Sequence, residues 1–298
     1  MLHGRMLRYL DEVARAGSIR KAADRLNVAA SAINRQILSL EQELETPIFE
    51  RMPGGLRLTA TGEILIVHVR ETLREHQKTL GRMAALKGLM RGEVVIATMG
   101  GLVDVLSDVL SEFRRQHPRV KLVVRVLLGE QIVRAVLDGE ADLGLAYDLP
   151  QHPRLFRAME WRQSLGAVFA PDHPLADRLS VRFADLMPYP LVTAERGMAL
   201  REAVEQQVPS NIEFLPAVET NAIELMKLLA RETPSITFMG LVEVQKEVRA
   251  GRLAFVPFSG TSARQSLALV HRAAGSLDAV ASVVVQHISA QVSARAET

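Results

Sequence analysis

The polar side chains best suited to chemistry in this chain lie in one short segment. Ser31, Asn34 and Arg35 share one side of a predicted helix, away from its apolar residues. An arginine fork matches O6 and N7 of guanine, an asparagine amide matches adenine, and a serine hydroxyl suits a phosphate or a base. The pattern indicates a surface that contacts nucleic acid. The alternatives are the solvated face of a helical hairpin and, for Arg35, an ion pair with Glu41 or Glu43.

Two short helices must position this surface. The first is predicted over Ile19 to Leu26, with Ser18 as its N-cap. Asn27 then breaks the helical pattern, because asparagine tolerates a left-handed backbone. Ala22 and Ala23 supply the small side chains that a close helix crossing needs. The second helix follows at once, an arrangement typical of a helix-turn-helix.

A predicted hairpin follows these helices. It has two short strands, joined by a tight turn at Pro53-Gly54-Gly55. Arg51 and Arg57 lie in these strands and are placed to contact the minor groove or the phosphates of DNA. Thr59 is predicted to cap the next helix, whose amide end can hold a phosphate. The hairpin is therefore interpreted as a wing.

These motifs resemble one known family. In chain order the sequence contains LRYLDEVARAGSIRKAADRL, INRQILSLEQEL, PIFER and LRLTATGE. Across roughly the first 65 residues they are similar to the N-terminal domain of LysR-type transcriptional regulators. The resemblance implies double-stranded operator DNA and a small-molecule effector as partners, RNA polymerase as a further partner, and a homodimer or homotetramer. The family usually has Ser-Gln-Pro where this chain has Ala29-Ala30-Ser31, so Ala30 stands at a contact position without the usual glutamine and the operator preference does not carry over.

Charge and composition restrict the class of protein further. Residues 1–90 hold 14 basic and 10 acidic residues, whereas the rest of the chain holds 22 and 24. The basic end therefore carries the helix-turn-helix, as phosphate binding requires. The absence of cysteine excludes disulfides, thiolate metal ligands and a cysteine nucleophile. The sequence has neither a signal-peptide pattern nor a run of about 20 apolar residues, so we expect a cytoplasmic protein without a membrane partner.

A long helix is predicted over residues 61–90. Apolar residues at alternating three- and four-residue spacing form a coiled-coil seam. They are Ile66, Val69, Leu73, Leu80 and Met83. A seam this narrow packs against one partner helix, and the resemblance implies that the partner is the same helix of a second subunit. We therefore expect a winged helix-turn-helix domain at residues 1–60, a linker (dimerisation) helix at 61–90 and an effector domain beyond.

Apolar strands alternate with helices after Gly92, which favours a parallel sheet covered on both faces. The resemblance implies a C-terminal periplasmic-binding-protein-like effector domain of two α/β subdomains, so the fold class is α/β with an N-terminal winged helix-turn-helix and a long linker helix. The first subdomain is expected at residues 91–162 and 267–298, and the second at 163–266. We expect crossovers near 157–164 and 259–266. A further strand is predicted over 212–218.

A ligand site is expected beyond the carboxyl ends of the strands, where helix N-termini point amide donors inward. The candidate ligand-binding residues are Thr98, Met99, Gly100, Gly101, Gly129, Glu130, Gln131, Thr193, Glu195, Thr220, Asn221 and Phe238.

The chemistry of this candidate set departs from the family. Relatives often bring hydroxyls to a ligand carboxylate from the first two loops, whereas Gly101 and Gly129 stand at those places here. Thr98 is a substitute for one hydroxyl, and Glu130 would repel an anion. Glu130 or Glu195 is therefore an alternative partner for an amine or a hydroxylated compound, although each also fits a solvated loop charge. Phe238 fits an apolar wall of the site or the core.

No catalytic, metal or cofactor site is indicated. The eight histidines lack HExxH or any other i, i+4 spacing, and no GxSxG, P-loop or GxGxxG is present. We therefore predict a ligand-responsive DNA-binding regulator that is not an enzyme. The alternatives are a solute-binding protein whose N-terminal helices serve only dimerisation, and an α/β enzyme, for which we find no nucleophile or base.

Overall fold

The computed structural model describes residues 5–85, 90–260, 263–273 and 277–296. The chain divides near Gly92 into two compact units, and each is described by itself. Among the described residues, no helix is both long and apolar enough to cross a membrane. The last part of the predicted linker helix, residues 86–89, lies outside the described residues.

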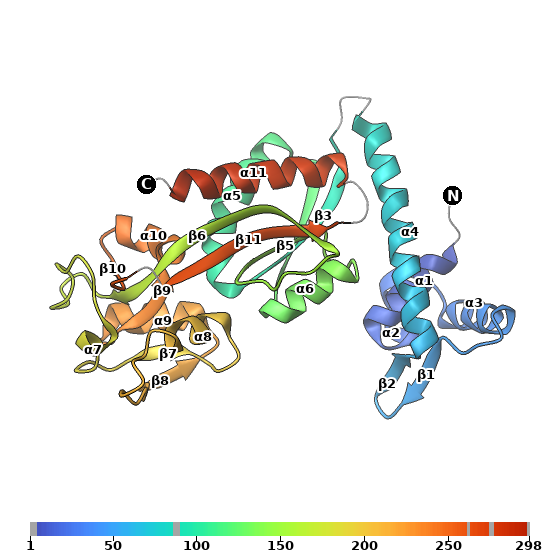
Figure 1. The fold of residues 1–298 in the computed structure, drawn as a ribbon. Helices are drawn as coiled ribbons and strands as arrows, with labels where there is room; N and C mark the ends of the chain where they lie inside the picture. Colours follow the sequence, from blue (N-terminus) through green and yellow to red (C-terminus); the bar gives the residue numbers. More distant parts are fainter. Residues whose placement is uncertain (1–4, 86–89, 261–262, 274–276, 297–298) are drawn as a thin grey trace. The chain divides into compact units, whose positions relative to one another are not determined.

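The N-terminal unit contains four helices and a two-stranded hairpin in its described part (Figure 1). In order, the elements are α1 (Arg5–Ala16), α2 (Ile19–Leu26), α3 (Ala30–Glu43), β1 (Phe49–Met52), β2 (Gly55–Leu58) and α4 (Ala60–Ala85).

The turn between α2 and α3 has the predicted chemistry. The Ser18 hydroxyl accepts a hydrogen bond from the backbone N–H of Lys21 at 3.4 Å, which caps α2. Asn27 adopts φ 53° and ψ 51°, so it ends α2 in the left-handed conformation. Ala22 and Ala23 are buried. The small side chains where the helices cross and the left-handed residue at the turn therefore set the angle between α2 and α3.

The core of the N-terminal unit corrects the predicted coiled-coil seam. Ile66 and Val69 are 4% and 0% exposed, because they pack with the core residues of α1 and α3 in the same chain. Leu73 packs partly against this core. Leu80 and Met83 are 42% and 55% exposed. The N-terminal half of α4 is thus packed into the same compact unit as α1 and α3, whereas Leu80 and Met83 further along the helix are free to contact a partner.

The C-terminal unit is an α/β assembly of two subdomains (Figure 1). Subdomain I holds β3 (Gly92–Thr98), the 3-10 turn η1 (Gly100–Leu102), α5 (Val103–Gln116), β4 (Val120–Val126), α6 (Gly129–Leu137), β5 (Leu143–Tyr147) and α11 (Ala279–Ala296). Subdomain II holds α7 (Phe183–Leu186), β7 (Val192–Ala194), α8 (Ala199–Glu205), β8 (Val218–Thr220), α9 (Ile223–Glu232), β9 (Thr237–Gly240), α10 (Leu241–Arg249) and β10 (Ala254–Pro257). Strands β6 (Leu155–Phe169) and β11 (Arg264–Arg272) connect them.

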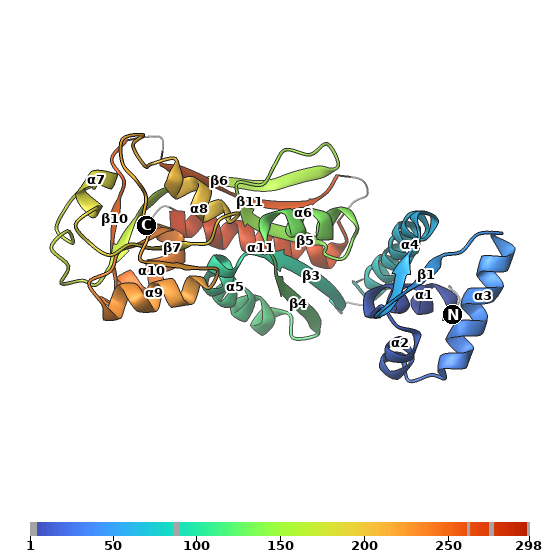
Figure 2. The same ribbon diagram turned by 90° about the horizontal axis from the view of Figure 1, so that it is seen from below.

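One long strand passes through both subdomains. The 15-residue β6 pairs with β11 over 155–164 and with β9 and β10 over 165–169. The strand order is β10-β6-β11-β5-β3-β4, with β9 also paired to β6. Helix α6 lies on one side of the subdomain I sheet and helices α5 and α11 on the other, as Figures 1 and 2 show. The two subdomains therefore share a continuous sheet.

Two details differ from the predictions. The sheet is mixed, because β3 and β5 run parallel whereas β11 runs antiparallel to both β5 and β6. The strand predicted over 212–218 is wrong, since β8 begins only at Val218. Ile212 and Phe214 instead pack against the core of subdomain II from an irregular segment. Their alternating apolar pattern reflects this packing and not a strand.

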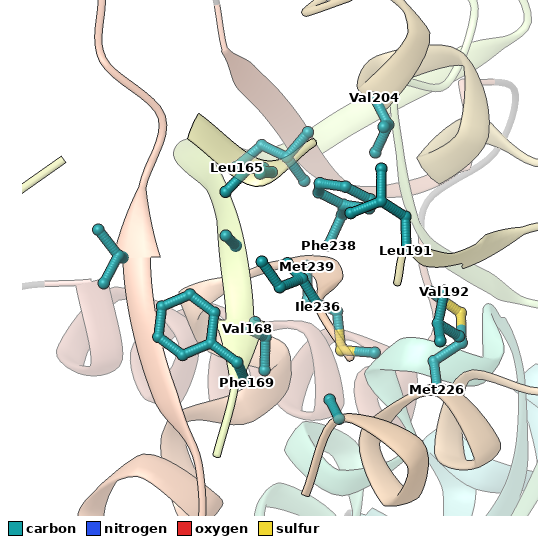
Figure 3. Packing of buried hydrophobic residues seen from close by; sticks show 14 of the residues in the cluster. Leu165, Val168, Phe169, Leu191, Val192, Val204, Met226, Ile236, Phe238 and Met239 are labelled. Atoms are coloured by element: carbon teal, nitrogen blue, oxygen red, sulfur yellow. The ribbon is translucent and has the colours of Figure 1, made fainter. Parts of the chain in front are cut away.

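The core of subdomain II contains residues from β6, β7, β9 and the helices around them. Figure 3 shows Phe238 among the side chains of Leu165, Leu191 and Val204. The Phe238 ring stacks on Phe258, with 5.9 Å between ring centroids. This packing fixes β9 against β6, and α10 starts where β9 ends.

Gly62 offers a test of how α4 joins its domain. A glycine inside a helix is normally stabilised by substitution to alanine, by roughly 0.5–1 kcal/mol. At Gly62, however, a Cβ would collide with the backbone carbonyl oxygen of Ile48. We expect Gly62→Ala to destabilise the N-terminal unit by about 2 kcal/mol. Urea denaturation of the full chain measures this, with Thr61→Ala as the control; a stabilised Gly62→Ala protein would contradict the expected packing.

Candidate nucleic-acid interface and ligand cleft

Helix α3 presents the predicted polar side chains as an outer face. Ser31 and Arg35 are exposed and Asn34 is half-buried, whereas Ile33 and Ile37 are buried in the core. Ala30, at the first position of α3, is half-buried. Because the apolar side of α3 is fixed by packing, its polar side has a defined direction.

The predicted ion-pair alternative for Arg35 is not formed within the described part of the chain. Glu41 accepts hydrogen bonds from the backbone N–H groups of Ile48 at 2.7 Å and Phe49 at 3.2 Å, so it serves the start of the wing. Glu43 is exposed and forms no ion pair with another residue that the structure describes. The guanidinium of Arg35 is therefore available to a ligand.

The wing is a two-stranded antiparallel hairpin with exposed arginines. Arg57 faces Glu50 across the strands and forms an ion pair with it at 2.8 Å, and both side chains are largely exposed. An exposed pair of this kind contributes only about 0.2–1 kcal/mol, so a phosphate can compete for Arg57. Arg51 is exposed. Thr59 caps α4 as predicted, since its hydroxyl accepts from the backbone N–H of Gly62 at 3.0 Å.

Thr98 and Phe238 were predicted to bind a ligand, but both side chains are buried in the core, so these two predictions are wrong. The Thr98 hydroxyl donates to the carbonyl oxygen of Leu145 at 3.1 Å, and the residue is fully buried. It therefore does not replace the missing hydroxyl. Phe238 is also fully buried, in the aromatic packing of subdomain II. Its role in the core removes it from the wall of a ligand site.

The remaining predicted ligand-binding residues lie in the strand-end loops with different exposure. Glu130, Gln131, Glu195, Asn221 and Gly100 are exposed, Met99, Gly129 and Thr220 are half-buried, and Gly101 and Thr193 are buried. Two of the polar side chains serve their own turns. Gln131 accepts from the backbone N–H of Leu128 at 3.2 Å, and Thr220 accepts from that of Ala222 at 3.1 Å. Neither exposed glutamate is placed in a closed site.

A buried polar cluster that the sequence did not predict joins the two subdomains. The Gln163 side-chain nitrogen donates to the hydroxyl of Tyr147 at 2.6 Å, and the Gln163 side-chain oxygen accepts from the backbone N–H of Val242 at 3.2 Å. Glu243 accepts from the backbone N–H of Gly240 at 2.9 Å. These contacts link β5, β6 and the start of α10.

Two glycines make room for this cluster. A Cβ at Gly240 would collide with the side-chain amide of Gln163, and a Cβ at Gly101 would collide with Oε1 of Glu243. Gly101 belongs to subdomain I and Glu243 to subdomain II. The carboxyl group of Glu243, from subdomain II, therefore packs directly against the loop that follows β3 in subdomain I.

Burial controls the protonation of the cluster. Desolvation raises the pKa of Glu243 to about 7, although the N–H of Gly240 and the charge of Lys227 act in the opposite direction. Burial also raises the pKa of the Tyr147 hydroxyl well above its usual value, with a further contribution from Glu243. Glu243 is therefore largely protonated below neutral pH, while Tyr147 stays neutral.

Ion pairs join the subdomains beside this cluster. The ammonium group of Lys227 on α9 lies 2.8 Å from Oδ2 of Asp104 on α5 and 3.2 Å from Oε1 of Glu247. The Lys227 side chain is only 5% exposed, so this cation is well shielded from water. Lys246 on α10 pairs with Asp108 on α5 at 2.7 Å. We call these contacts the clasp.

The sequence carries only weak signals for the cluster. Tyr147 ends an apolar strand, Gln163 interrupts the apolar pattern of β6, and Glu243 occupies the third position of a helix, where glutamate commonly serves as a cap. Each residue alone is unremarkable, and only the tertiary fold brings them together. Among the described residues, no group of three or more His, Asp or Glu residues is arranged to hold a metal ion.

Together, a winged helix-turn-helix and a two-subdomain α/β unit define a bacterial transcription regulator with a ligand-binding domain. Residues 5–63 match the model of the bacterial regulatory helix-turn-helix proteins of the lysR family, and residues 87–293 match the LysR substrate binding domain. The chain belongs to the LysR family of transcriptional regulators. The predicted solute-binding alternative, in which the N-terminal helices serve only dimerisation, does not account for the first of these matches.

Relatives and solved structures agree with this assignment. The chain is 30% identical over 267 residues to the HTH-type transcriptional regulator CbbR of Xanthobacter flavus, covering 86% of this chain and 78% of that one. It is 26% identical to a probable RuBisCO transcriptional regulator of Emiliania huxleyi, covering 89% and 87%. The fold is similar to full-length OxyR from Pseudomonas aeruginosa, with a TM-score of 0.74, 18% identity and 96% and 93% of the chains covered. It is also similar to full-length CbnR in complex with its target DNA, with a TM-score of 0.61, 21% identity and coverage of 96% and 99%.

Glu243 makes stability depend on pH in a defined direction. Its pKa is about 7 in the folded chain against an ordinary value of 4.5, so its contribution to the free energy of unfolding is fully present below about pH 4.5 and is lost as the pH rises through 7. The full loss amounts to about 3 kcal/mol, at roughly 1.4 kcal/mol per pH unit. We expect the melting temperature of the wild type to fall between pH 5 and pH 8 relative to Glu243→Gln. Parallel pH profiles for the two proteins would contradict this assignment.

Proposed function

We propose that this LysR-type regulator contacts operator DNA through Arg35, with Asn34 and Ser31 as neighbouring contacts. The observation that carries the proposal is the exposed guanidinium of Arg35, which forms no ion pair with the residues that the structure describes, on a helix whose opposite side is packed into the core. Its fork suits guanine O6 and N7 in the major groove. Ala30 lies at the start of the same helix, where its methyl group suits an apolar contact with a thymine methyl.

The wing and the start of α4 supply contacts to the DNA backbone. Arg51 and Arg57 suit phosphates or the minor groove, and Thr59 places the N-terminus of α4 where a phosphate would be favoured. The excess of four basic residues over residues 1–90 supports this arrangement. One solved relative of similar fold, CbnR, is bound to its target DNA.

We propose that the cleft between subdomains I and II receives a small-molecule effector. We assign the rim of this site to the loops at the strand ends. These loops and the strand ends beside them hold Met99, Gly100, Gly101, Gly129, Glu130, Gln131, Thr193, Glu195, Thr220 and Asn221. The buried cluster of Tyr147, Gln163 and Glu243 lies between the same two subdomains, and we assign it to the floor of this site. A ligand that binds one separation of the subdomains better than another shifts the population of the two states, which is how the effector would control the regulator.

Dimerisation is assigned to the exposed part of α4. Leu80 and Met83 lie one helical turn apart and stay exposed in the single chain. Pairing of this helix with its copy would place two recognition helices on one DNA, in a dimer or a tetramer. We place the protein in the cytoplasm, where operator DNA and RNA polymerase are found, and assign it regulation without catalysis, as the family relationship supports.

Replacing Arg35 tests the DNA contact. We expect Arg35→Ala to weaken binding to the DNA upstream of its own gene by at least about tenfold, because one bidentate base contact contributes about 1–3 kcal/mol. Fluorescence anisotropy titration at fixed salt measures the affinity. Arg178→Ala, which removes an exposed arginine in the effector domain, is the matched control. An unchanged affinity of Arg35→Ala, with an unchanged melting temperature, would refute the role of Arg35.

Replacing the exposed apolar pair tests the dimer. We expect the double variant Leu80→Glu with Met83→Glu to shift the protein toward monomer, because two charges per helix would face each other across the seam. Light scattering after size exclusion gives the mass directly. Glu71→Lys changes the charge of α4 away from the seam and should leave the mass unchanged. A double variant with the wild-type mass would show that the subunits associate elsewhere.

A further inference from the structure

We propose that Glu243 sets the charge of the effector, so that the cleft accepts a ligand carrying a cationic nitrogen, in an ammonium, amidinium or guanidinium group, and rejects a carboxylate. This inference rests on the proposed role of the cleft as the effector site. It concerns the chemical class of the ligand, and it follows from four features of the residues around Glu243.

The first feature is the position of the carboxyl group. Glu243 is the third residue of α10 in subdomain II, yet its Oε1 lies against Gly101 of subdomain I, in the turn that follows β3. The residue is only 4% exposed. A side chain of any size at position 101 would need the space that this oxygen fills. The carboxyl group of Glu243 is therefore placed beside the end of a subdomain I strand, where ligands bind in open α/β sheets.

The second feature is that helix capping explains only one of the two oxygens of this carboxyl group, Oε2. Oε2 accepts the backbone N–H of Gly240, which is the usual role of glutamate at the third helical position. Capping does not require burial, and burying an ionisable carboxyl group is costly. Its placement between the two subdomains indicates a second use, in which an incoming group contacts Oε1.

The third feature is that no side chain described in the two strand-end loops of subdomain I offers a positive charge to a ligand carboxylate. Gly101 and Gly129 offer no side-chain donor, and the Thr98 hydroxyl is used by Leu145. The buried cation of the clasp, Lys227, is neutralised by carboxylates on three sides. An anionic ligand would therefore keep Glu243 in its protonated form and gain no ionic partner there, whereas a cationic ligand gains the ionised carboxylate as its partner.

The fourth feature is an unsatisfied amide beside the cluster. Gln265 is 1% exposed, and neither atom of its side-chain amide has a hydrogen-bond partner in the described part of the chain. Gln265 is directly paired with Gln163 in the antiparallel ladder of β11 and β6, so both side chains lie on the same face of the sheet. Tyr147 pairs with Leu267 and shares this face. A buried amide without partners points to a polar group that is still to be bound.

The protonation state of Glu243 suits a cationic ligand. Burial raises the pKa of this carboxyl group, and the N–H of Gly240 and the ammonium of Lys227 act in the opposite direction. Glu243 in turn contributes to the raised pKa of the Tyr147 hydroxyl, which packs in the same cluster. Burial keeps the pKa of Glu243 near 7, so the free protein holds a proton there in mildly acidic solution. A bound cation takes the place of that proton, which passes to the buffer, and the site keeps its charge balance. Cation binding should therefore release protons, up to one per site.

The experiment uses the full-length protein and probes of matched length and opposite charge. Agmatine and 1,4-diaminobutane are compared with succinate and with uncharged 1,4-butanediol, at equal ionic strength and about pH 6.5. A wider panel of primary amines, amidines and guanidines follows. We expect at least one cationic probe to raise the melting temperature by about 3 °C or more at about ten times its dissociation constant, and succinate and butanediol to have no such effect. Isothermal titration in two buffers of different ionisation enthalpy then counts the protons released.

Variants separate this role from a structural one. Glu243→Gln keeps the side-chain size and the helix cap, and should lose both the cation-dependent shift and the proton release. Glu213→Gln removes an exposed glutamate of subdomain II that lies outside the strand-end loops, and it should retain both. If Glu243→Gln fails to fold, the proton count for the wild type remains the test: cation binding with proton release supports the inference, and cation binding without it contradicts the inference. A stabilising carboxylate, a cation effect that survives in Glu243→Gln, or no effect from any cation in the panel would overturn the inference.

The outcome is separable from that of the proposed function. If DNA binding depends on Arg35 but a carboxylate stabilises the wild type, only the inferred ligand class is wrong. If a cation binds as expected but leaves the affinity for DNA unchanged, the ligand class stands and the proposed control of DNA binding fails.

Discussion

The fold of the effector domain depends on the antiparallel pairing of β6 and β11. β6 pairs with β11 at one end and with β9 and β10 at the other, so a single strand belongs to the sheets of both subdomains. Backbone hydrogen bonds along a shared strand hold the subdomains together without fixing their separation, because a strand can twist or bend. The separation is set by side chains away from the hinge. They are the clasp and the polar cluster around Glu243, and both are electrostatic contacts that a charged ligand can alter.

These two sets of contacts have different physical character. In the clasp, Lys227 and its carboxylates are all charged, and the pair at 2.8 Å tolerates burial because each charge has a partner. In the cluster, Glu243 has no cation within hydrogen-bonding distance among the described residues and relieves its burial by holding a proton. The clasp therefore stabilises the observed arrangement over a wide pH range. The cluster responds to changes near neutrality and to any group that can replace a proton.

Local signals made the N-terminal domain predictable, whereas the ligand cleft required tertiary structure. Ser18, Asn27 and Thr59 act on the backbone within three residues, so their types indicated their roles directly. Ile66 and Val69 fitted a coiled-coil seam and a domain core equally well, since both environments use the same helical spacing. Thr98 was expected to face a ligand, but nothing local shows that the carbonyl of Leu145 takes its hydroxyl. Tyr147, Gln163 and Glu243 come from three separate segments, and no local pattern joins them.

The glycines of the cleft are best understood together with the side chains that fill their space. Gly101 and Gly240 have ordinary backbone conformations, so neither is required by a turn. Each is required because a polar side chain from elsewhere, Glu243 or Gln163, occupies the volume of the missing Cβ. A hydroxyl side chain at position 101, such as relatives use for a ligand carboxylate, cannot coexist with Glu243 in its present place. The choice of glycine at 101 and glutamate at 243 is therefore one coupled choice, and it determines which charge the cleft can accept.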